Sequence, residues 1–82
     1  MRTPKTSYGW ARHRMRNAAH FLKGGYLHAV LHNLWFAAKE CQNVPSSERR
    51  DTLAREITTE FHKLADMLHA YADHWQEVDD EG

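Results

Sequence analysis

Apolar residues recur every three or four positions along almost the whole chain, and this pattern is interrupted at two places. The first interruption is the pair Gly24 and Gly25, and the second is the polar, proline-containing segment 43–47. A spacing of three and four residues is the period of an amphipathic α-helix. The sequence therefore predicts an all-α fold, with one domain over residues 1–82 and three helices over about 7–23, 26–42 and 47–77. The polar tail 78–82 is expected to fray.

The first predicted helix has one narrow apolar stripe, formed by Tyr8, Ala11, Met15, Ala18 and Leu22. Residues spaced in this way share one face of a helix, so this face is expected to enter the core. Gly24 suits the left-handed position that ends many helices, and Lys23 favours the negative end of the helix dipole.

The second predicted helix is the most apolar of the three. Its main stripe consists of Leu27, Leu31, Leu34, Ala38 and Cys41. Three further residues widen the stripe beyond half of the circumference: Tyr26, Val30 and Ala37. A helix that is apolar over so much of its surface is expected to be the most buried element.

The third predicted helix begins after Pro45, with Ser46 or Ser47 suited to cap it. Its apolar stripe is long, and the second part has a spacing close to that of a coiled-coil seam. We expect the core and a dimer seam along this part, formed by Phe61, Leu64, Leu68, Tyr71 and Trp75.

The predicted lengths of the helices do not match. The first two would be roughly 25 Å long and the third roughly 45 Å. Either the third helix bends or breaks, near Ile57, Thr58 and Thr59, or its uncovered part packs on a second copy of the chain. The sequence favours the second alternative, so the three-helix bundle, a hairpin packed on a long helix, is expected to form a homodimer.

The size and the single cysteine restrict the class of protein. A chain of 82 residues has a marginal core that no disulfide can support, because Cys41 is the only cysteine. Its neighbours Ala37 and Ala38 indicate a buried structural thiol. No apolar run of the roughly 20 residues that a membrane span needs is present, and no signal peptide is recognisable. A soluble, cytoplasmic protein is expected.

The charges are divided between the two halves of the chain. Residues 1–39 carry seven cations and no acid, whereas residues 40–82 carry 11 acids and four cations. The net charge of zero therefore combines a half of +7 with a half of −7. Such an asymmetry indicates a binding surface or a self-complementary assembly.

The cations of the first helix are the main candidate for that binding surface. Four of its residues share one face: Arg12, Arg16, His20 and Lys23. Four others fall on another face, away from the core stripe: Trp10, Arg14, Asn17 and Phe21. Cations beside aromatic rings can bind an acidic protein surface, or phosphates and bases. A third interpretation is that the acidic third helix neutralises these cations.

Histidines suggest a further, weaker possibility. His28 and His32 lie one turn apart in the second helix, and His62, Asp66 and His69 follow a helical spacing in the third. Imidazoles and carboxylates at such spacings can bind a metal ion. The same residues also fit an ordinary solvated face, so no cofactor is expected.

No catalytic motif is present, since the serines lie at element edges and no phosphate-binding loop occurs. The sequence predicts a small non-enzymatic regulator or inhibitor that binds a larger protein through the basic and aromatic first helix. Small phage-encoded inhibitors of host machinery have this general profile. Binding of nucleic acid or a nucleotide by the same face is the alternative, and a metal-binding bundle is the third.

Overall fold

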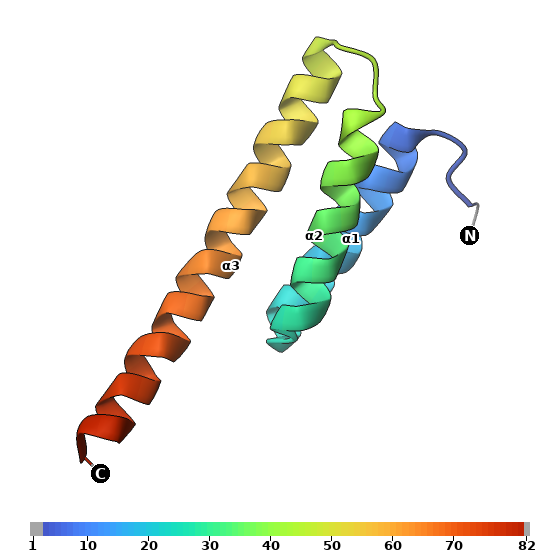
Figure 1. Ribbon diagram of the computed structural model, residues 1–82. Helices are drawn as coiled ribbons and strands as arrows, with labels where there is room; N and C mark the ends of the chain where they lie inside the picture. Colours follow the sequence, from blue (N-terminus) through green and yellow to red (C-terminus); the bar gives the residue numbers. More distant parts are fainter. Residues whose placement is uncertain (1–2, 82) are drawn as a thin grey trace.

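The protein is a bundle of three α-helices and has no strand among the described residues, which confirms the predicted fold class (Figure 1). The computed structural model describes the backbone of residues 3–81 and the side chains of residues 3–73. Helix α1 spans Ser7–Gly24, α2 spans Leu27–Gln42 and α3 spans Glu48–Glu81. Helices α1 and α2 form an antiparallel hairpin, and α3 returns along it.

Short polar residues and a glycine determine where the helices begin and end. The Thr6 hydroxyl accepts a hydrogen bond from the Gly9 backbone N–H (3.0 Å), and the Ser47 hydroxyl accepts one from Arg50 N–H (3.2 Å). Each bond satisfies a donor that the first helical turn leaves unpaired. Gly25, with φ of 78°, takes the left-handed conformation after α1. The prediction had placed Gly24 there, but Gly24 is the last helical residue.

The contact between α1 and α2 is built from small side chains. Ala11, Ala18 and Ala37 are completely buried, which allows the two helix backbones to approach closely. Asn33 lies nearby with only 5% of its surface exposed. Its side-chain amide donates to the Ala29 carbonyl (2.8 Å), and its carbonyl accepts from Arg14 (3.4 Å). These bonds satisfy the polar groups that burial removes from water.

Helix α3 covers one side of the hairpin and packs more extensively on α2 than on α1. Its buried residues Leu53 and Ile57 pack with Cys41 near the α2–α3 connection, in what we call the upper cluster. Leu64 packs with Val30 nearer the α1–α2 turn, in what we call the lower cluster. The half-buried side chains of Met15 and Phe61 each pack against both clusters. Because these two residues connect the clusters, the core is continuous. The expected burial of Cys41 and Leu64 is confirmed.

The buried face of α2 differs from the predicted one. Val30, Leu34 and Ala37 are fully buried, but Leu31 is 47% exposed and Tyr26 is 66% exposed. Helices α1 and α3 together cover only one arc of α2. The buried arc of α2 is therefore centred on Val30, Leu34 and Ala37, whereas the predicted main stripe also included Leu31. Because Leu31 is not covered, α2 keeps an exposed apolar surface.

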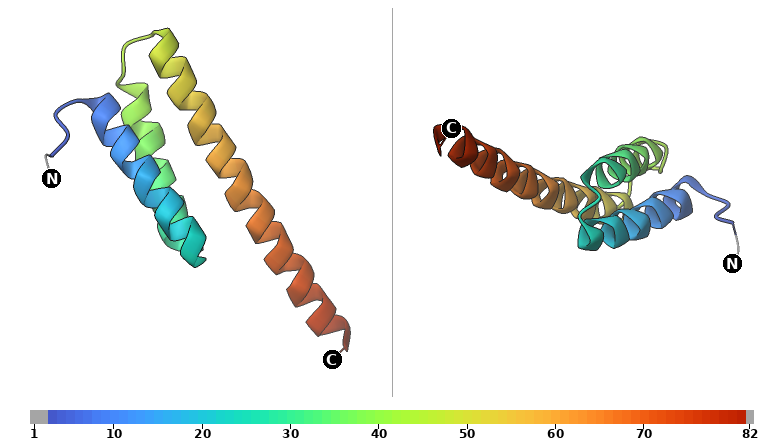
Figure 2. Two further views of the ribbon diagram at one scale, coloured as in Figure 1. Left: turned by 180° about the vertical axis from the view of Figure 1, so that it is seen from behind. Right: turned by 90° about the horizontal axis from the view of Figure 1, so that it is seen from below.

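The far half of α3 extends beyond the hairpin without a break (Figures 1 and 2). The alternative of a bend or break at Ile57–Thr59 is therefore wrong, and the helix continues through Glu81 rather than ending near residue 77. Leu68 and Tyr71, predicted as core and dimer seam, are 50% and 52% exposed in the single chain, because the hairpin ends near the level of Leu64. They are therefore not part of the core of one chain. The side chain of Trp75 lies outside the described residues.

Candidate interaction surface

The seven residues predicted to bind a partner lie on two different sides of α1. Arg14 and Phe21 turn toward α2 and its N-terminal cap, where Arg14 donates a hydrogen bond to Asn33 and the rings of Phe21 and Tyr26 lie edge to face. Arg12 turns toward α3 and forms an ion pair with Glu56 (3.7 Å). The seven residues therefore do not form one continuous surface.

On the α2 side, aromatic rings and cations from two helices alternate. We call this the aromatic–cation surface; its members are Trp10, His13, Arg14, Trp35, Phe36 and Lys39. The Arg14 guanidinium lies 4.8 Å from the centre of the Phe36 ring, and Lys39 Nζ lies 4.6 Å from the Trp35 ring. Trp35 and Phe36 meet edge to face at 4.9 Å, as do Trp10 and His13 at 5.8 Å. Each of these contacts favours this arrangement of the rings by about 0.5–1.5 kcal/mol.

The surface follows from helical spacing on two antiparallel helices. Trp10 and Arg14 are one turn apart on α1, as are Trp35 and Lys39 on α2. A shallow hollow joins the two helices and is lined by Trp10, Arg14, Phe36 and Glu40. Half of the Trp35 surface is exposed, so a large apolar side chain is accessible to a partner.

On the α3 side, Arg16 and Lys23 follow Arg12 at four and eleven positions, and both are exposed. His20, also exposed, has its ring against the edge of Phe21. Among the side chains of residues 3–73, Arg12–Glu56 is the one ion pair that joins two helices. Among these side chains, the neutralisation of α1 cations by α3 is therefore limited to the Arg12–Glu56 pair, whose N–O distance of 3.7 Å is long for an ion pair.

The histidine positions do not converge. His28 and His32 border a shallow hollow on α2 together with Leu31 and Trp35, and His62, Asp66 and His69 are exposed on α3. In the described part of the chain, no three His, Cys, Asp or Glu side chains are grouped as a metal ion requires.

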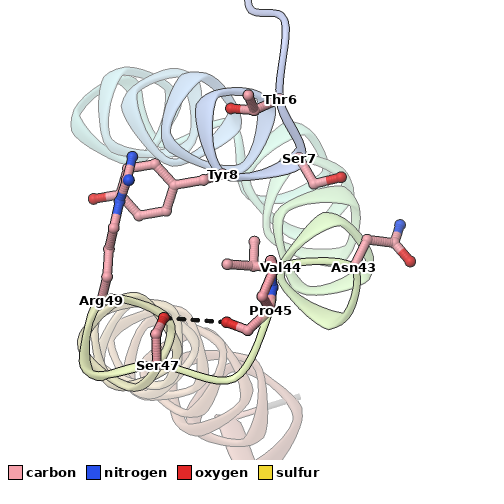
Figure 3. Close-up of a pocket in the computed structure, with 8 residues that line it drawn as sticks. All are labelled: Thr6, Ser7, Tyr8, Asn43, Val44, Pro45, Ser47 and Arg49. Atoms are coloured by element: carbon pink, nitrogen blue, oxygen red, sulfur yellow. Dashed lines mark hydrogen bonds between the residues drawn. The ribbon is translucent and has the colours of Figure 1, made fainter.

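A separate open hollow of about 440 Å³ lies where the N-termini of α1 and α3 meet (Figure 3). The Arg49 guanidinium stacks over the Tyr8 ring at 3.6 Å and forms one wall. The hydroxyls of Thr6 and Ser47 already cap helices, and Ser47 also donates to the Pro45 carbonyl (3.1 Å). We therefore assign no binding role to this hollow.

Four members of the aromatic–cation surface were not predicted as partner-binding residues: His13, Trp35, Phe36 and Lys39. The spacing of Trp35 and Lys39 was visible in the sequence, on the face of His28 and His32. Their proximity to Trp10 and Arg14 depends on how the hairpin closes, so no local pattern could reveal it.

The fold and this surface define the chain as a small all-α, three-helix protein with an exposed aromatic and cationic face. No known protein family, curated protein or solved structure matches it. Within residues 3–81, no helix combines the length and the apolarity needed to cross a bilayer.

Proposed function

We propose that this chain is a non-enzymatic interaction protein, a regulator or inhibitor that binds a larger cytoplasmic protein through the aromatic–cation surface. The observation that carries the proposal is the half-exposed Trp35 ring with Lys39 over its face, next to Arg14 on Phe36. Tryptophan and arginine are the residues most often found at the energetic centre of protein interfaces.

The partner should present carboxylates around an apolar pocket. Residues 1–39 contain no acid, so the cations of α1 and Lys39 of α2 lie in a segment without negative charge. Opposite charge on the partner would accelerate encounter and fix orientation, and burial of Trp35 would supply affinity.

Two features favour a protein over a nucleic acid. Lys39 lies over one face of the Trp35 ring and Arg14 over one face of the Phe36 ring, which reduces the ring area available for stacking on bases. Glu40 also lines the hollow beside Arg14 and would repel the evenly spaced phosphates of a nucleic-acid backbone, whereas a protein can place its carboxylates near Lys39 and away from Glu40. A nucleic acid therefore fits this surface less well than an acidic protein.

Combining Trp35→Ala with Lys39→Glu should weaken partner binding by roughly 30-fold or more, because truncating one such anchor costs about 2 kcal/mol. The partner would be captured from a host-cell extract on the immobilised chain, purified, and titrated by calorimetry. The matched control combines Tyr26→Ala with Lys23→Glu, an exposed aromatic residue and an exposed lysine outside the surface.

Equal affinity of the two double variants for the partner would contradict the proposal. A parallel titration with DNA and RNA at low salt tests the alternative. Binding that weakens steeply with salt, and that both variants weaken alike, would support a nucleic-acid function instead.

A further inference from the structure

Helix α3 carries two apolar surfaces that its own chain leaves uncovered, one on each half. On the near half, a groove of about 290 Å³ runs between α2 and α3; its lining residues include Ala38, Ala54, Ile57 and Phe61. On the far half, Leu68 and Tyr71 form what we call the distal stripe, and both are about half exposed. The two surfaces follow one another along the same helix.

The groove is mostly apolar and has small residues on both walls, which are the features of a surface that accepts a helix. Ala38 and Ala54, one on each wall, have short side chains that let another backbone approach closely. Phe61, half-buried at its lower end, adds apolar area. The distal stripe carries the larger side chains Leu68 and Tyr71 at helical spacing, and these can fill the space left above the small groove residues.

The exposed area exceeds what a monomer of this size normally leaves. The chain exposes 6315 Å², whereas a compact protein of 9.6 kDa exposes about 5,100 Å². Its radius of gyration is 15.5 Å, compared with about 11.7 Å for a compact chain of this length. The excess of about 1,200 Å² over the whole chain, polar area included, is enough to accommodate the roughly 800 Å² that each partner buries in a standard interface.

Charge indicates what covers these surfaces and in which direction. After Lys63 the chain carries six acids and no lysine or arginine, and Arg50 lines the groove. A parallel pair of α3 helices would place six acids beside six acids. In an antiparallel pair, the acidic far half of each copy lies instead along the near half of the other copy's α3, where three arginines balance the three acids of residues 48–58.

We propose that two copies associate antiparallel about a two-fold axis near Phe61, with the distal stripe of each in the α2–α3 groove of the other. Leu68 and Ala54 are both seven residues from Phe61, so Leu68 of each copy lies level with Ala54 of the other. Because this contact is isologous, it covers the groove and the distal stripe of both copies. It leaves Trp10 and Arg14 on another side of the hairpin.

The test is sedimentation equilibrium of the full chain at about 100 µM, well above a micromolar Kd. The wild type should be a dimer. Leu68→Glu and Ala54→Glu should each raise the dimer Kd at least about tenfold, since each places a charge in an apolar contact. Both positions are exposed within one chain, so circular dichroism should show unchanged helicity.

The matched control is Ala70→Glu, exposed and about 200° around α3 from Leu68, which should remain dimeric. A monomeric wild type would overturn the proposal and leave the surfaces to a different protein. Loss of the dimer with Leu68→Glu but not with Ala54→Glu would overturn the pairing of stripe with groove. Equal disruption by Ala70→Glu would overturn the assigned face.

Discussion

Leu34→Ala should lower the free energy of unfolding by about 2–5 kcal/mol, because Leu34 is completely buried in the lower cluster with Val30 and Leu64. Removing its side chain leaves a cavity between all three helices. In a domain of this size, 1 kcal/mol corresponds to roughly 4–8 °C in Tm. A fall of about 8 °C or more is therefore expected in thermal unfolding followed by circular dichroism.

Leu31→Ala is the matched control, since it is the same substitution three residues earlier in α2. Leu31 is 47% exposed, so the loss should be below about 1 kcal/mol. Equal losses for the two variants would mean that α2 is not oriented as described here.

Leu64→Ala should also cost about 2–5 kcal/mol, whereas Leu68→Ala should cost less than about 1 kcal/mol in the monomer. Leu64 is 3% exposed and Leu68 is 50% exposed, although they lie one turn apart on the same stripe of α3. Urea unfolding at a chain concentration where light scattering shows monomers measures both values. At higher concentrations, a loss for Leu68→Ala would report on association.

A large monomeric loss for Leu68→Ala would place the end of the core beyond Leu64 and would contradict the fold. A negligible loss for Leu64→Ala would remove the contact between α3 and the lower end of the hairpin.

The number of helices could be predicted because the signals that separate them are local. Gly24 and Gly25, and later Pro45 and Ser47, interrupt the apolar period within a few residues. The narrow stripe of α1 was also sufficient to identify its core face, since Ala11 and Ala18 are fully buried. These features need no knowledge of distant segments.

The orientation of α2 and the end of the core could not be predicted in the same way. Leu31 and Leu34 are chemically identical, and α2 is apolar over more than half of its circumference, so its period does not decide which arc is buried. On α3 the stripe continues unchanged past Leu64. Burial stops there because the hairpin is shorter, which is a property of the packed fold.

The candidate surface was predictable only in part. The cations of α1 were identified, but their division between the α2 and α3 sides depends on where the other helices lie. Arg12 meets Glu56 and Arg14 meets Phe36, two contacts across long sequence separations. Phe36 gave no signal before the hairpin placed it beside Arg14.

The most direct test of the proposed function is an NMR titration of the ¹⁵N-labelled chain with the captured partner, following the indole N–H signals. The chain has three tryptophans, Trp10 and Trp35 on the aromatic–cation surface and Trp75 in the far half of α3. Stoichiometric partner should shift the signals of Trp35 and Trp10 and leave that of Trp75 in place. A bound partner that shifts Trp75 and leaves Trp35 unchanged would contradict the account.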